Sequence, residues 1–151
     1  MHNILVILHS YNRYLILAAL VFVLFRAYSG WLGQKPYGKA DNAGSAALLG
    51  LSHLQLLLGL IMYAFTSTWT QTAFADFGAA MKDPMQRYFA VEHILAMIIA
   101  VTLIQLGRTF SKKATTDTEK HRKLAIYTTI ALVIIAGTLA QKGLLFGSLT
   151  R

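Results

Sequence analysis

Four histidines stand within or beside long apolar segments, and they are the residues of this chain best suited to chemistry. They are His9, His53, His93 and His121. Ionisable side chains inside a membrane are costly and usually face the interior of a helix bundle or a wet cavity. Because neutral imidazole is a good ligand for haem iron, histidines on facing helices could clamp a haem in the core of a bundle. The same side chains could instead relay protons or hydrogen-bond neighbouring helices.

The depth of each histidine in the membrane decides which of them can meet. Arg13 and Arg26 are separated by a helical rise of about 20 Å, so both can reach outward from one spanning helix. His9 then lies near the boundary on the Arg13 side, and His93 lies about 9 Å inward from the same boundary, which Arg87 marks. We therefore expect His9 and His93 in the same half of the membrane, as two ligands of one haem iron.

The other two histidines are less well matched in depth. His53 is expected about 12 Å inside the opposite boundary, counted from Ser45. His121 precedes Lys123 in a charged run, so it is expected at the membrane surface, in a solvated basic loop. A second haem held by His53 and His121 would require the fourth helix to begin earlier than its charges suggest.

Two charged side chains accompany the first histidine pair. Arg13 and Glu92 fall at similar depth, and an ion pair between them would remove two expensive isolated charges. Arg13 could alternatively bind a haem propionate, because the guanidinium group suits carboxylate geometry. The sequence supports both arrangements.

Four apolar segments must position these side chains. Of the 151 residues, 56% are hydrophobic and 13% are charged, whereas about a quarter of the residues in globular proteins are charged. A helix crosses the hydrocarbon core with about 20 mostly apolar residues. Such segments lie at about 4–25, 46–65, 88–106 and 124–139. The chain is therefore expected to be all-α: one transmembrane four-helix bundle over residues 1–151.

Lysine and arginine positions predict the orientation of this bundle. The first and third loops are rich in these residues, whereas the second loop and the C-terminal tail hold few. The positive-inside rule then places the first and third loops in the cytoplasm and both termini on the non-cytoplasmic side. Arg26 follows the first apolar segment rather than preceding it, so this segment is expected to be a retained helix rather than a cleaved signal peptide.

The loops carry their own signals. In the second loop, Trp69, Phe74 and Phe77 suit a stretch that lies in the membrane interface, with a short amphipathic helix as one form it could take. In the first loop, Asp41, Asn42 or Ser45 could cap the second helix.

Several chemistries have no support in the sequence. Cysteine is absent, which excludes disulfides, thiolate metal sites and cysteine nucleophiles. No phosphate-binding loop, nucleophile elbow or paired-carboxylate motif occurs, so hydrolysis and phosphoryl transfer are unsupported and we assign no catalytic residue. The net charge of +8 comes from basic residues that lie between apolar segments and are not gathered on one polar surface. We therefore expect no nucleic-acid partner.

The order of motifs along nearly the whole chain resembles a family of small bacterial four-helix membrane proteins labelled cytochrome-b-like. The matching stretches include "HSYNRY", "GLSHLQLLLGL", "RYFAVEHILAM", "AVTLIQLGRTFSKK" and "KHRK". The chain is also similar, more loosely, to the b561-type cytochromes. The resemblance implies haem b, one group or two, held by His9, His53, His93 and His121, with electrons exchanged with quinone. It also implies a multi-pass protein of the bacterial inner membrane.

The sequence thus predicts a b-type cytochrome that carries single electrons, with quinone or a redox protein as partner. At most it would be an electron-transfer or oxidoreductase component, and a homo- or hetero-oligomer is compatible with its small-residue helix positions. The alternative is a non-catalytic membrane subunit or assembly factor whose polar residues hold the bundle together. A haem-dependent oxidase of porphyrin or quinol substrates is a third prediction, for which no substrate pocket stands out.

Overall fold

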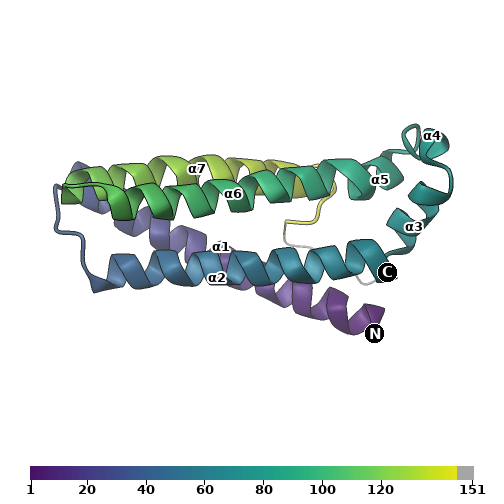
Figure 1. Ribbon diagram of the computed structural model, residues 1–151, viewed down its shortest axis with the longest axis horizontal. Coiled ribbons are helices and arrows are strands. Elements are labelled where there is room, and N and C mark those ends of the chain that lie inside the picture. The colour runs from purple at the N-terminus through teal and green to yellow at the C-terminus, as the bar shows by residue number, and fades with distance from the viewer. Residues whose placement is uncertain (146–151) are drawn as a thin grey trace.

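Four long helices make up most of the computed structural model, which describes residues 1–145 (Figure 1). They are α1 (His2–Leu32), α2 (Lys39–Ile61), α6 (His93–Lys113) and α7 (Asp117–Ala140). All four belong to helical segments that are long and apolar enough to cross a membrane. The all-α prediction with four candidate spans is therefore confirmed for the described part of the chain.

The helices extend beyond the apolar segments that predicted them. α1 continues to Leu32, and α7 begins at Asp117, ahead of the charged run that contains His121. The Thr116 side chain caps α7 by accepting a hydrogen bond from the backbone N–H of Glu119, which satisfies a free donor of the first turn. Hydropathy locates the apolar part of a helix, whereas its caps decide where the helix begins and ends.

The second and third candidate spans both contain a π-helical stretch. α2 continues into η1 (Met62–Thr66), and α6 is preceded by α5 (Pro84–Arg87) and η2 (Tyr88–Glu92). Both π-helical stretches lie at the end of the bundle where the second loop runs. Single π-helical turns inside α-helices often mark functional sites, and this pair borders the residues described below.

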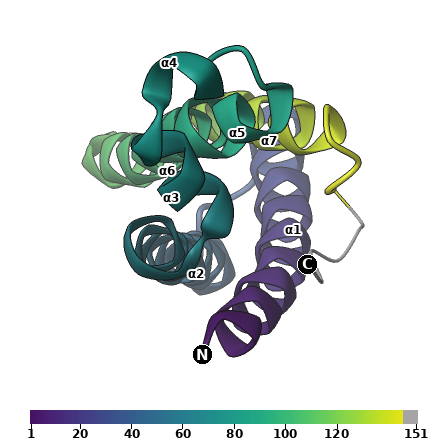
Figure 2. The same ribbon diagram turned by 90° about the vertical axis from the view of Figure 1, so that its right-hand side faces the viewer.

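The four helices form a ring in which each packs against two neighbours (Figure 2). α1 lies against α2 and α7, and α6 lies against the same two helices, so α1 and α6 face each other across a diagonal. α6 and α7 approach closely because Gly107 has no side chain. A Cβ at Gly107 would lie 2.6 Å from the Cβ of Tyr127, which is closer than two carbon atoms can approach.

The connections are divided between the two ends of the bundle (Figure 1). The first loop, at 33–38, and the third, at 114–116, lie together at one end, whereas the N-terminus lies at the other. The second loop folds into α3 (Thr68–Ala75) and α4 (Phe77–Ala80), which confirms a short helix there. α2 begins at Lys39 with Gly38 as its N-cap, earlier than the expected caps. Asp41 lies in the first turn, where its Oδ2 accepts a 2.9 Å hydrogen bond from the N–H of Gly38.

Candidate functional site

A cavity lies among the four helices, toward the end of the bundle that holds the N-terminus. Its wall is mainly apolar, with a small set of polar residues. These are His9, Arg13, Ser52, Gln55, Tyr63 and His93. Two of the four candidate histidines thus border one space, which we call the histidine cavity.

His9 and His93 come from α1 and α6, the two helices that face each other across the bundle. Both also border a second, neighbouring cavity together with His2 and Trp69. Nε2 of His9 lies 3.4 Å from the position that a Cβ on Gly59 would occupy, so the absent side chain leaves the imidazole edge accessible. The structure brings together the pair that depth alone predicted.

The environment of His93 leaves one ring nitrogen without a partner. Its Nδ1 atom is buried and forms no hydrogen bond within the described residues. The ring packs near Tyr88 and Phe89, with centroid separations of 5.6 and 6.2 Å. Tyr88 is fully buried and its hydroxyl donates to the carbonyl of Thr138 over 2.8 Å, which fixes the aromatic wall behind His93. A buried nitrogen without a partner is costly, and a bound group would relieve that cost.

An amide pair ties α1 to α2 directly behind His9. Nδ2 of Asn12 donates to the carbonyl of Leu51 and to Oε1 of Gln55, each over 2.9 Å. Nε2 of Gln55 donates in turn to the carbonyl of His9 over 2.9 Å. Asn12 is one of the polar residues at the head of the first apolar segment, but the sequence predicted no partner for it.

Replacing Gln55 with leucine should loosen this contact, because it removes both the acceptor for Asn12 and the donor to His9. Interhelical hydrogen bonds in membrane proteins contribute about 0.6–2 kcal/mol each, so we expect a lower thermal unfolding midpoint in detergent. Gln105→Leu is the matched control, because within residues 1–145 Gln105 bonds only Thr109 of its own helix. Equal midpoints for the two variants would contradict a role in holding α1 to α2.

Arg13 and Glu92 do not pair, so this prediction was wrong. Nε of Arg87 lies 2.8 Å from Oε1 of Glu92, and the reason is the π-helical stretch between them, which aligns residues five positions apart. Arg13 is 6% exposed, lies 5.0 Å from the centroid of the Tyr14 ring and borders the histidine cavity. Its position is compatible with the alternative prediction, a contact with an acidic group of a bound molecule.

His53 and His121 lie away from the histidine cavity and away from each other. His53 is on the exposed face of α2, whereas its neighbour Ser52 and Gln55 face the cavity. His121 is 1% exposed, so the prediction that it belongs to a solvated loop was wrong. Because α7 begins at Asp117, His121 occupies the second turn of that helix and turns toward α1.

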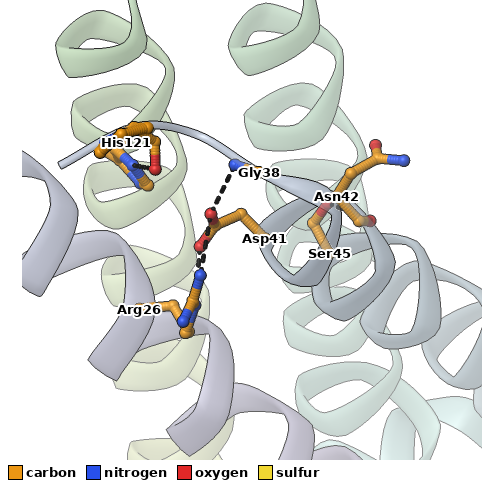
Figure 3. Close-up of polar contacts among 7 residues, drawn as sticks. Arg26, Gly38, Asp41, Asn42, Ser45 and His121 are labelled. Carbon is orange, nitrogen blue, oxygen red and sulfur yellow. Dashed lines mark hydrogen bonds and ion pairs between the residues drawn. The ribbon is translucent and has the colours of Figure 1, made fainter.

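The His121 ring lies against the first loop (Figure 3). Its Nε2 lies 3.3 Å from the carbonyl of Pro36, and its centroid lies 5.2 Å from that of Tyr37. The ring also fills the space above Gly30, where any Cβ would collide with it. This histidine therefore holds the first loop onto α1 and α7.

An ion pair beside His121 reinforces this contact. Arg26 contacts Asp41 through two hydrogen bonds, 2.9 Å from Nε and 3.1 Å from Nη2 (Figure 3). Arg108 of α6 reaches across to the start of α2, where it donates to the Oγ of Ser45 over 2.6 Å. Arg26 of α1 and Arg108 of α6 thus make structural contacts at this end.

Within residues 1–145, no group of three or more His, Asp or Glu side chains is placed to hold a metal ion. A site built from protein ligands alone is not formed there. Haem iron needs only axial ligands from the protein, since the porphyrin supplies the others. His9 and His93 are two residues of the type that serve as axial ligands of haem iron.

Comparisons with protein-family models, with curated proteins and with solved structures found no significant match.

Proposed function

We propose that this chain is an integral membrane b-type cytochrome that carries single electrons and holds one haem b between α1 and α6. The observation that carries the proposal is that His9 and His93, from diagonally opposed helices, border the same apolar cavity. Bundle cores in which ligands project from facing helices are a common way of binding cofactors. A haem bound there would supply reversible one-electron chemistry at iron.

Three features of the cavity fit a haem. The imidazoles of His9 and His93 supply two ligands of the right type, and the missing side chain of Gly59 leaves space beside His9. The buried Nδ1 of His93 lacks a partner among the described residues, which ligation of the ring or a molecule in the cavity would explain. Arg13 borders the same space and would hold a propionate, because guanidinium binds carboxylate through parallel hydrogen bonds.

The proposal includes one haem rather than two. His53 points away from the bundle interior, and the His121 ring is packed against Gly30 and the first loop. Neither residue borders the histidine cavity. Both are accordingly assigned no role in cofactor binding.

We also propose that the protein lies in the bacterial inner membrane, with the histidine cavity near its outer face. The loops at 33–38 and 114–116 lie at one end of the bundle and are flanked by most of the lysines and arginines. The positive-inside rule assigns that end to the cytoplasm. The N-terminus and the histidine cavity then lie toward the non-cytoplasmic side, where quinone or a redox protein would exchange electrons.

An absorption spectrum tests the cofactor directly. Purified in mild detergent after haem-replete expression, the protein should show a Soret band and, after dithionite, the sharp α and β bands of six-coordinate reduced haem. A pyridine extract should give one haem b per chain. Folded protein without a Soret band would reject the cytochrome and favour the non-catalytic subunit or assembly factor.

A further inference from the structure

The second loop forms a compact cap on the end of the bundle. Ala73 of α3 and Ala80 of α4 are fully buried and cluster with Ala90 of η2. These small side chains let α3 and α4 lie close to the start of the third span. The buried hydroxyl of Thr70 donates to the carbonyl of Tyr63 over 2.8 Å, which fixes the cap to the end of the second span as well.

The outer side of this cap is aromatic. Phe74 and Phe77 stack with a centroid separation of 6.2 Å and an interplanar angle of 15°, although they are 59% and 47% exposed. Phe65, at the end of the second span, is 72% exposed. Large exposed apolar side chains that gather in one place mark an interaction surface rather than a water-facing one.

This aromatic surface continues the outer face of α2 without a charged residue between them. The exposed Leu57 and Leu60 belong to that outer face, and no Asp, Glu, Lys or Arg occurs from residue 43 to residue 75. The next charged residue along the chain is Asp76. A surface that faces lipid along α2 therefore meets no charged residue before it reaches Phe74.

We propose that the α3–α4 cap lies in the outer interface of the bilayer, with Phe74 and Phe77 inserted among the lipids at the boundary between headgroups and acyl chains. A helix that lies in the plane of that zone buries an apolar side that carries Trp, Phe or Leu. The proposal rests on the membrane insertion proposed above. Trp69 and Thr70 of the cap line the second cavity together with His9 and His93, so the cap would then separate that cavity from bulk water.

The absence of cysteine allows a single spin label to report this directly. Phe74→Cys is labelled in vesicles of phosphatidylcholine and phosphatidylglycerol, and its collisions with oxygen and with a water-soluble nickel chelate are compared. Thr72→Cys is the matched control, because Thr72 and Phe74 flank the buried Ala73 and point about 200° apart on α3. Leu57→Cys, on the outer face of α2, serves as the reference for a spanning position.

We expect nickel collisions at residue 74 to be several-fold fewer than at residue 72, with oxygen collisions approaching those at residue 57. Equal nickel access at residues 72 and 74 would overturn the interfacial position of the cap. Shielding of residue 74 from both reagents would also overturn it and would indicate a protein partner. Free access of the nickel chelate to residue 57 would reject membrane insertion itself. The measurement at residue 57 therefore distinguishes failure of membrane insertion from failure of the interfacial position of the cap. Phe77→Cys repeats the measurement if Phe74→Cys does not fold.

Discussion

Replacing His93 with alanine is expected to abolish the haem absorption of the purified protein. His93 borders the histidine cavity opposite His9, and its ring is held by Tyr88 and Phe89. Truncation removes one of two proposed iron ligands from an otherwise apolar wall, so haem content per chain should fall to near zero. The ratio of Soret to protein absorbance, with a pyridine extract, measures this loss.

Two further variants separate ligation from a merely structural role. His93→Met should retain haem with an altered spectrum and a higher midpoint potential, because methionine is an axial ligand that raises the potential of haem iron. His53→Ala should change neither, because His53 lies on the exposed face of α2. A His93→Ala protein that keeps its full Soret band, or a loss of haem equal in His53→Ala, would contradict the assignment.

Replacing Gly30 with alanine is expected to destabilise the bundle strongly. A Cβ at this position would collide with three atoms of the buried His121 ring, which is itself confined by Tyr37 and the carbonyl of Pro36. Overpacking of a filled site costs about 1–3 kcal/mol. The thermal unfolding midpoint in detergent should fall, whereas the haem spectrum of the folded fraction should not change.

Gly50→Ala is the matched control for this experiment, since a Cβ there would meet nothing within 4 Å. Alanine is also the better helix former, so stability should stay the same or rise. The double variant Gly30→Ala with His121→Ala should recover part of the loss, because the two residues are in contact and their effects are coupled. Gly30→Ala with an unchanged midpoint would show that the His121 ring does not confine α1.

Hydropathy and depth were sufficient to predict four candidate spans and to place His9 and His93 at the same end of the bundle, where both border one cavity. Both follow from the rise of an α-helix and the thickness of a bilayer. The position of His121 could not be predicted in this way. The neighbouring charges indicated a surface loop, whereas the Thr116 cap starts α7 at Asp117, so that the charged run is helical. The burial of His121 depends on Gly30, a residue of another helix.

Side-chain partners were harder to predict than depth. Arg13 and Glu92 have matching depth, yet Glu92 binds Arg87 because the intervening turn is π-helical, and no periodicity in the sequence signals such a turn. The bonds of Asn12 to α2 are likewise set by the rotation of one helix about its axis relative to another. Depth is a one-dimensional property of each segment, whereas these contacts depend on all three dimensions.

The π-helical turn before His93 also adds one residue to the third candidate span and thereby rotates the side chains that follow it. A π-turn accommodates one residue more than an α-turn over the same rise, so the helix on either side keeps its packing while the phase of its side chains changes by about 100°. Downstream, α6 is fixed against α7 where Gly107 meets Tyr127. Within the π-helical stretch itself, Ala90 packs against Ala73 and Ala80 of the cap. The extra residue lets one continuous span satisfy both contacts, so the third span has a required length as well as a required composition.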